Sequence, residues 1–142
     1  MKYLLDTCVI SELVKKTPDA NVIRWLDEQN EHKLFLSVLT LGELQKGISK
    51  LPDGGRKTDL QAWVSHELPE RFEGRVVGLG LETAMTWGRV QGESEQAGVR
   101  LPVMDSLIAA TAIANEFTVV TRNVKDLGRC RARVFDPWHE ET

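Results

Sequence analysis

Five residues with carboxylate or amide side chains lie directly after apolar stretches or near the starts of helical patterns. They are Asp6, Glu43, Asp105, Asn123 and Asp126. Carboxylates that are crowded into one cleft repel one another, so they either raise a pKa or bind a cation. Hard oxygen ligands of this kind suit Mg²⁺ or Mn²⁺. A metal site is therefore one chemistry that these residues could perform together.

Each of these residues also has an ordinary structural explanation. Asp6 follows an apolar stretch and could cap a helix, and Asp105 in a first helical turn would complement the helix dipole. Glu43 on a helix is suited to a solvated surface, whereas Asn123 and Asp126 are common turn residues. Spacing alone therefore leaves both a shared metal site and a set of unrelated structural roles open.

The order of strand-like and helical patterns predicts how the chain would bring these residues together. Apolar runs typical of short buried strands occur at residues 3–5, 34–38, 75–77, 118–121 and 134–135. Helical patterns occur at residues 7–14, 21–28, 40–49, 56–68, 81–96 and 102–115. Parallel strands need crossover helices, so we expect a three-layer α/β/α fold with a central, mostly parallel sheet. Ligands bind outside the carboxyl ends of such strands, where Asp6 and residues 122–126 would lie.

Composition excludes several other classes of protein. The 142 residues are enough for one domain, residues 1–142, with its own hydrophobic core. A net charge of −3 argues against a protein that coats nucleic acid over its whole surface. Two cysteines are too few for a disulfide framework, and we see neither a signal peptide nor a membrane span. We therefore expect a cytoplasmic protein that makes no contact with membrane.

Four stretches resemble, in the same order, the acidic blocks of the PIN-domain family. They read LLDTCVISE at 4–12, LSVLTLGEL at 36–44, PVMDSLIAATA at 102–112 and VVTRNVKDL at 119–127. The ending VFDPW at 134–138 is also similar to FitB-like members. The resemblance covers nearly the whole chain, and it is to the VapC and FitB-like toxins of prokaryotic toxin–antitoxin pairs. It implies a PIN-like fold and a Mg²⁺-dependent endoribonuclease, with Mn²⁺ as an alternative ion.

The resemblance also implies roles for individual residues. Asp6, Glu43 and Asp105 match the metal-binding acids of the family. At the fourth acidic position the chain has Asn123 where some members have Asp, and Asp126 lies three residues further on. Asn offers a carbonyl oxygen without a charge, which leaves open whether one metal ion or two bind.

Three neighbours of the first acid complete this prediction. We expect Thr7 and Ser11 to be polar supports for Asp6. Many family members have Asn where this chain has Cys8. We interpret Cys8 as a small buried residue, because sulfur is a poor ligand for Mg²⁺.

The family further implies three partners. The substrate would be RNA. A small antitoxin would cover the acidic pocket with its C-terminal segment, often with an Arg side chain, and would bind operator DNA through its N-terminal domain. The toxin itself would form a homodimer.

A basic segment lies next to the proposed site. Residues 122–133 contain five basic residues and one acid, a net charge of +4. Either the segment is a solvated charged loop, or it binds the RNA backbone. The residues predicted to contact RNA are Arg122, Lys125, Arg129, Arg131 and, near Glu43, Lys46.

The four tryptophans are candidates for stacking on RNA bases. Trp25, Trp63 and Trp87 lie in helical patterns, which favours packing within the protein. Trp138 lies outside these patterns.

One alternative function remains open, a non-catalytic PIN-like module that binds only RNA or a protein partner. The neutral Asn123 is the feature that favours it.

Overall fold

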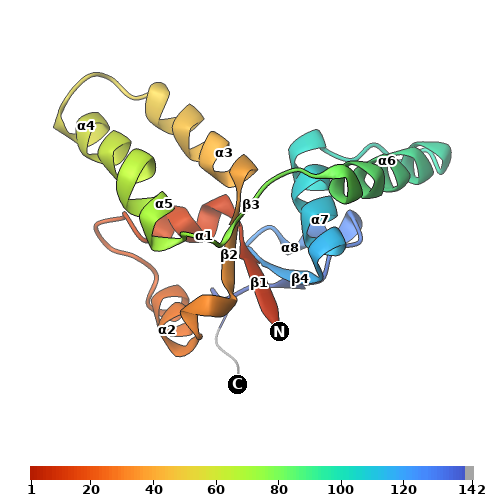
Figure 1. Ribbon diagram of the computed structural model, residues 1–142, viewed down its shortest axis with the longest axis horizontal. Coiled ribbons are helices and arrows are strands. Elements are labelled where there is room, and N and C mark those ends of the chain that lie inside the picture. The colour runs from red at the N-terminus through yellow and green to blue at the C-terminus, as the bar shows by residue number, and fades with distance from the viewer. Residues whose placement is uncertain (140–142) are drawn as a thin grey trace.

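Five short parallel strands form the centre of the protein, in a computed structural model that describes residues 1–139 (Figure 1). They are β1 (Lys2–Leu5), β2 (Leu34–Ser37), β3 (Val76–Val77), β4 (Phe117–Val120) and β5 (Val134–Phe135). Their order across the sheet is β3-β2-β1-β4-β5, and all four pairings are parallel. The predicted α/β fold with a central parallel sheet is confirmed.

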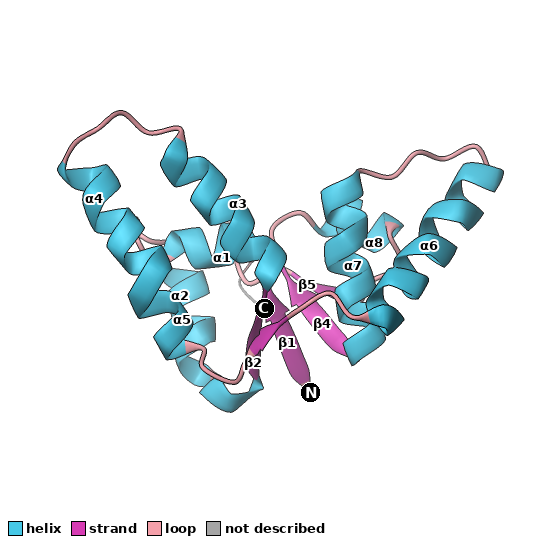
Figure 2. Cartoon of the chain, turned by 45° about the horizontal axis from the view of Figure 1, so that its top comes forward, coloured by secondary structure: helices cyan, strands magenta, loops and turns pink. Residues whose placement is uncertain are grey.

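Helices cover both faces of this sheet (Figure 2). On one side lie α1 (Thr7–Glu12), α2 (Ala20–Glu28), α3 (Val38–Ser49), α4 (Gly55–Ala62) and α5 (Leu68–Arg71). On the other lie α6 (Leu81–Gln96), α7 (Val103–Asn115) and α8 (Val124–Arg129). A 3₁₀ turn (Glu31–Lys33) precedes β2, and a π-helical turn (Trp63–Glu67) joins α4 to α5. The molecule therefore has three layers, as expected.

Alternating side chains of the central strands supply both hydrophobic cores. In β1, Leu4 packs under α6 and α7, whereas the next residue, Leu5, packs under α1 and α3. In β4, Val119 and Val120 divide in the same way. Successive side chains of a strand point to opposite faces, so an uninterrupted apolar run is what a sheet covered on both sides needs. All four side chains are buried, each worth about 2 kcal/mol of hydrophobic stabilisation.

The connectivity places a switch point between β1 and β4. The chain moves from β1 to β2 and β3 in one direction, and then returns to add β4 and β5 on the other side of β1. Crossover helices therefore leave β1 and β4 toward opposite faces of the sheet. The carboxyl ends of these two strands lie beside an opening that no crossover covers, which is where parallel sheets bind ligands.

Three details differ from the sequence prediction. Helix α8 was not predicted, because its apolar side is narrow and four charged or glycine residues surround the fully buried Leu127. Pro69 was expected to end a helix, but the helical turns continue to Arg71. The wider π-helical turn just before it accommodates a residue without an N–H donor. Helix α3 begins at Val38 instead of Thr40, because the side chain of Ser37 caps it.

None of the helices within residues 1–139 combines the length and apolar character that crossing a membrane requires.

Candidate active site

Asp6 directly follows β1, and its carboxylate is held from two sides. The backbone N–H of Asp6 donates to the carbonyl of Val120 at 3.0 Å, so the chain segments after β1 and β4 leave the sheet side by side. Oδ1 of Asp6 accepts a hydrogen bond from the N–H of Thr7 at 2.9 Å and caps α1. Oδ2 accepts one from the hydroxyl of Thr121 at 2.8 Å. Asp6 is therefore a helix cap and a pocket carboxylate at the same time.

Glu43 is joined to this arrangement through Thr7. The hydroxyl of Thr7 donates to Oε1 of Glu43 at 2.7 Å, which links α1 to the second turn of α3. Thr7 thus contacts two carboxylates, that of Asp6 through its backbone and that of Glu43 through its side chain. Ser11, one turn further along α1, lines the same pocket but forms no side-chain hydrogen bond to Asp6 within residues 1–139.

Asp105 and Asn123 come from the other layer of the fold. Asp105 lies in the first turn of α7, and Asn123 precedes α8, where its N–H donates to the hydroxyl of Thr121 at 2.9 Å. Asp126 lies in the first turn of α8 but is not among the residues that line the pocket. Of the two candidates for the fourth position, Asn123 therefore lines the pocket and Asp126 does not.

These residues surround one open pocket of about 590 Å³ at the carboxyl ends of β1 and β4. It is lined by Asp6, Thr7, Cys8, Ser11, Glu43, Asp105, Arg122 and Asn123. Residues from α1, α3, α7 and the segment after β4 thus converge, although they are spread over most of the sequence.

The pocket carries a net negative charge, because three carboxylates and one arginine line it. Partial burial raises the pKa of Asp105 above its usual value, and the charges of Asp6, Asp126 and Glu43 raise it further. All of these electrostatic contributions disfavour the ionised form. Asp126 therefore acts on the pocket electrostatically even though it does not line it.

The donor chemistry of the pocket fits a hard divalent cation. Within residues 1–139, no three His, Cys, Asp or Glu side chains are grouped closely enough to enclose one ion by themselves. Mg²⁺ commonly takes only one or two carboxylates and keeps several waters, so it does not need such a cage. Burial and, after it, the charges of the neighbouring carboxylates raise the pKa of Asp105, and a bound cation would offset both effects. Asp6, Glu43 and Asp105 could thus hold Mg²⁺ or Mn²⁺ partly through water.

The structure differs from the sequence prediction at two residues of the pocket region. Thr121 had no predicted role, and Cys8 was predicted to be buried. Thr121 is fully buried and its hydroxyl bridges Asp6 and Asn123. Its signal in the sequence was a polar residue at the end of an apolar strand. Cys8 was expected to be buried, but it is half-buried and lines the pocket. Its Sγ lies 3.9 Å from Oδ2 of Asp6. Burial and the charge of Asp6 raise the pKa of the Cys8 thiol, so it stays protonated.

The basic residues predicted to contact RNA lie in three different settings. Arg122 lines the carboxylate pocket. Arg131 forms an ion pair with Glu93 of α6, with 2.6 Å between Nη1 and Oε2. The remaining three are exposed on α8 and α3: Lys125, Arg129 and Lys46.

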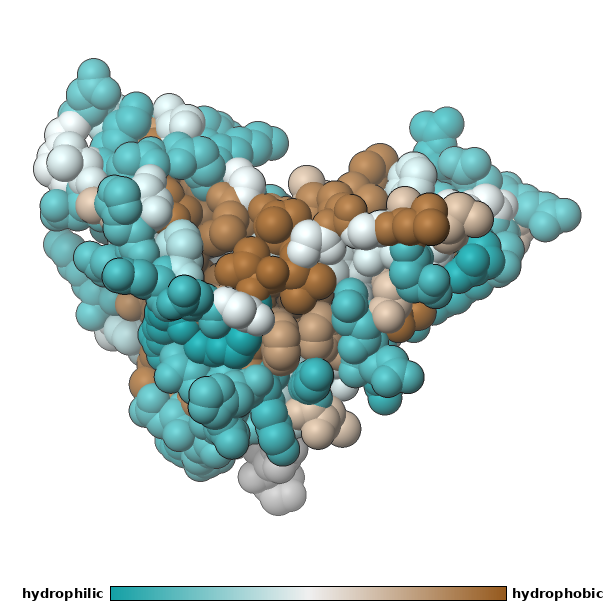
Figure 3. All heavy atoms as spheres, viewed as in Figure 1, coloured by the Kyte–Doolittle hydropathy of each residue, from teal (hydrophilic) through white to brown (hydrophobic). Residues whose placement is uncertain are grey.

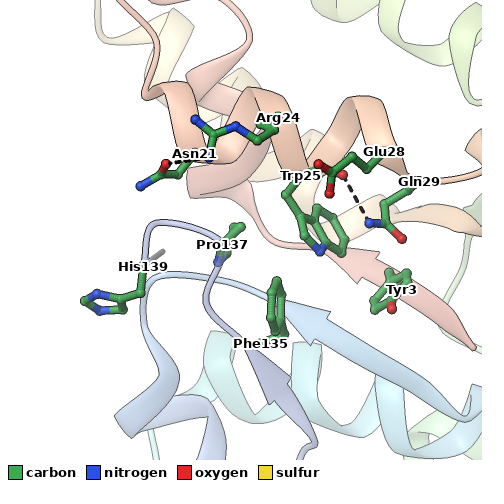
Figure 4. Close-up of a pocket in the computed structure, with 9 residues that line it drawn as sticks. All are labelled: Tyr3, Asn21, Arg24, Trp25, Glu28, Gln29, Phe135, Pro137 and His139. Atoms are coloured by element: carbon green, nitrogen blue, oxygen red, sulfur yellow. Dashed lines mark hydrogen bonds between the residues drawn. The ribbon is translucent and has the colours of Figure 1, made fainter. Parts of the chain in front are cut away.

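A second pocket, of about 420 Å³, lies between α2 and the C-terminal segment (Figure 4). The rings of Tyr3, Trp25 and Phe135 form its wall. It contains a single acid, Glu28, so it does not repeat the carboxylate arrangement of the first pocket.

The three-layer fold with a parallel sheet and a carboxylate pocket at its switch point is the architecture of an α/β protein that binds its ligand at the carboxyl ends of its strands. The chain belongs to the PIN-domain family, whose family model, described as PIN domain, matches residues 3–129. The resemblance seen in the four acidic sequence blocks is therefore confirmed.

Individual relatives cover almost the entire chain. Plasmid stability protein StbB of Pseudomonas syringae pv. tomato is 36% identical over 95% of this chain and 97% of its own. VapC ribonuclease Y4jK of Sinorhizobium fredii is 34% identical over 95% of this chain and 96% of its own. Toxin FitB of Neisseria gonorrhoeae is 31% identical over 96% of this chain and 99% of its own.

A solved structure of FitAB bound to an IR36 DNA fragment has a similar fold. Its matching chain superposes with a TM-score of 0.90 at 31% identity, over 99% of this chain and 98% of its own.

The raised pKa of Asp105 leads to a prediction about stability. A raised pKa means that the folded state keeps its proton to higher pH than the unfolded state, so the free energy of unfolding falls as pH rises past about 3.8. Asp105→Asn removes a charge that both burial and the neighbouring carboxylates disfavour, and should stabilise the metal-free protein at pH 7 by on the order of 1 kcal/mol. We expect the midpoint of thermal unfolding, followed by circular dichroism, to rise by about 2–4 °C.

The control is Asp59→Asn on the exposed side of α4, which should leave the midpoint unchanged. The gain from Asp105→Asn should also disappear at pH 3, where Asp105 is protonated in both states. A midpoint at pH 7 that stays the same or falls would contradict the electrostatic account of the pocket.

Proposed function

We propose that this protein is a metal-dependent endoribonuclease that cleaves RNA phosphodiesters, and that it is the toxin of a toxin–antitoxin module. The observation that carries the proposal is the convergence of Asp6, Glu43 and Asp105 on one pocket at the switch point of the sheet. Relatives named VapC ribonuclease and Toxin FitB support the same activity and the same biological role.

The residues of the pocket have distinct tasks in this proposal. A bound Mg²⁺ or Mn²⁺ ion would supply a Lewis acid that offsets the negative charge of the pocket and lowers the pKa of a bound water. Asp6 and Asp105 hold the ion, and Thr121 and the N–H of Thr7 fix the orientation of the Asp6 carboxylate. Glu43 is oriented by the hydroxyl of Thr7 at Oε1, which leaves Oε2 to orient the attacking water or to hold a second ion.

The fourth position completes the shell. Asn123 offers a neutral oxygen at the pocket wall, and Asp126 adds negative charge without lining the pocket. This reduced charge favours a second candidate function, a non-catalytic PIN-like module that binds RNA or a protein partner. Calorimetric titration with Mn²⁺ separates the two, because only the nuclease requires Asp105-dependent ion binding.

We also propose a small antitoxin as the partner of this protein, which binds DNA as a complex with it. Solved relatives are described as FitAB bound to an IR36 DNA fragment and as VapBC2 bound to a DNA fragment from their promoter. The open carboxylate pocket is suited to an antitoxin segment that inserts an Arg side chain. Both cysteines are free thiols, which is consistent with action in the cytoplasm, where RNA and antitoxin are made.

A second copy of the chain is the partner that we propose for an exposed apolar surface. Figure 3 shows hydrophobic side chains gathered in the hollow between the α3–α4 arm and the α6–α7 arm. Large exposed apolar side chains on these elements are Val38, Leu81, Met85, Val103, Met104 and Ile113. Apolar patches of this kind mark association surfaces, and a homodimer would bury this one next to Asp105.

Loss of the pocket carboxylates should abolish RNA cleavage. Asp6→Asn and Asp105→Asn each remove a metal-holding charge, and each should lower cleavage of total cellular RNA at least about 100-fold. EDTA should have the same effect on the unchanged protein, and added Mg²⁺ or Mn²⁺ should reverse it. The exposed Asp59→Asn should cleave normally, and undiminished cleavage by either pocket variant would refute the site.

The salt dependence of RNA binding tests the basic segment. Arg129 is exposed on α8, so Arg129→Ala should reduce the slope of log K against log salt by about 0.7. Arg131 is held by Glu93, so Arg131→Ala should change this slope less. Fluorescence anisotropy with a single-stranded RNA measures both slopes. If the two variants change the slope equally, or if neither changes it, the RNA contact lies on another part of the surface.

The dimer surface is tested by adding charge to α6. Leu81 and Met85 lie one turn apart on this helix with exposed fractions of 81% and 56%. Leu81→Asp combined with Met85→Asp should convert a dimer into a monomer in sedimentation equilibrium. Gln96→Asp, which adds one charge to the far end of the same helix, should remain dimeric. A double variant that still dimerises would move the interface to another face.

A further inference from the structure

One cation stands among the carboxylates of the pocket. Arg122 is the single basic residue that lines the pocket within residues 1–139. A guanidinium beside three carboxylates would ordinarily form a salt bridge with one of them. Up to His139, however, Arg122 forms no ion pair, and its guanidinium carbon lies 4.3 Å from the centre of the Trp138 ring.

This cation–π contact holds the guanidinium without neutralising it. A carboxylate partner would occupy the N–H groups of Arg122 and cancel its charge. The face of an indole ring attracts the cation but leaves its N–H groups free, because the attraction comes from the ring quadrupole. Arg122 therefore keeps both its charge and its donors available to a ligand in the pocket.

Trp138 is itself fixed in place through its backbone. Its N–H donates to Oδ1 of Asp136 at 2.8 Å. Its carbonyl accepts a hydrogen bond from Nδ2 of Asn21 at 3.0 Å, which attaches the C-terminal segment to α2. Figure 4 shows Asn21 on α2 facing the segment that carries Pro137 and His139. The ring that supports Arg122 thus belongs to an anchored part of the chain.

The indole nitrogen does not explain why a tryptophan occupies this position. Nε1 of Trp138 is buried, and it has no hydrogen-bond partner within the described residues. A buried indole N–H normally finds a partner, so the polar group of this side chain brings no visible benefit. The side chain packs against the hydrophobic core on the α1–α5 side of the sheet, as other large apolar residues could. What an indole adds to this packing is a ring face under Arg122, and indole is the best of the three aromatic rings for binding a cation.

We infer that Arg122 binds the phosphate of the RNA substrate at the carboxylate pocket, and that Trp138 is a positioning residue that holds Arg122 for this task. The inference rests on the proposed function, because it assigns the phosphate-binding residue of that same site. A planar guanidinium matches two phosphate oxygens at once, whereas a lysine ammonium acts as a point charge. The backbone N–H of Arg122 lies 3.5 Å from Sγ of Cys8, two residues from Asp6. From there the side chain extends to the Trp138 ring, where its guanidinium lies.

The test is a double-mutant cycle between the two residues. Arg122→Ala should lower kcat/KM for RNA cleavage about 10–100-fold, because a charge-assisted contact to phosphate is lost. Trp138→Ala should lower it about 3–10-fold, through misplacement of Arg122. In a protein that already carries Arg122→Ala, Trp138→Ala should have no further effect. Trp138→Phe keeps a ring face and should recover most of the activity, whereas Arg122→Lys should recover little.

The controls separate positioning from a general loss of structure. Arg100→Ala removes an exposed arginine, and Trp25→Phe changes a tryptophan that packs on Tyr3 and Phe135 instead of Arg122. Both should cleave RNA normally. If Trp138→Ala lowers kcat/KM by the same factor with and without Arg122, its role is structural and the inference is wrong.

A binding measurement distinguishes this inference from the proposed nuclease function. The same cycle is measured by fluorescence anisotropy on a single-stranded RNA with Ca²⁺ in place of Mn²⁺, because Ca²⁺ also binds carboxylate oxygens and is used here to keep the RNA intact. Non-additive losses of affinity in a protein that cleaves nothing would overturn the nuclease and retain the phosphate contact. Additive losses in an active nuclease would overturn the contact alone. Absence of RNA binding by the unchanged protein would overturn both.

Discussion

The negative charges of Asp6, Glu43 and Asp105 repel one another, and the fold has to hold them around one pocket against that repulsion. The cost is visible at Asp105, whose pKa is raised by burial and by the charges of its neighbours. A structure can tolerate such a cluster only if rigid elements fix each carboxylate separately. Here each acid belongs to a different element, so no single loop has to bring two of them together.

Helix starts supply part of the compensation. Asp6 caps α1, and Asp105 lies in the first turn of α7, where the partial positive charge of a helix N-terminus favours an anion. Hydroxyl groups also stabilise the charged carboxylates, since the hydroxyl of Thr121 donates to Asp6 and that of Thr7 donates to Glu43. The capping roles and the pocket roles of these acids are therefore not alternatives. The same local interactions that begin the helices also hold the carboxylates in place.

The sequence predicted the acids of the pocket better than it predicted their supports. Asp6 follows a strand, Asp105 lies in the first turn of a helix, and Glu43 lies one turn further into the helix that follows the second strand. These positions made the three acids recognisable, because parallel strands end on one edge of a sheet. The contact between Thr121 and Asp6 depends on β1 and β4 being neighbours, which no local pattern encodes. Trp138 lies close to Arg122 only because the tail folds back onto α2. Local patterns made these acids candidates and the family resemblance assigned them a metal-binding role, whereas the supporting contacts required the strand order.

That strand order has a consequence for synthesis of the protein. The hydroxyl that orients Asp6 is 115 positions further along the chain, and β4 pairs with β1 on the opposite side from β2. While the chain is made from its N-terminus, Asp6 and Glu43 emerge from the ribosome long before the strand that completes their surroundings. The pocket consequently does not exist on a nascent chain until residues 117–123 have left the ribosome. Any activity that depends on this pocket therefore requires a chain on which β4 has already been made and paired with β1.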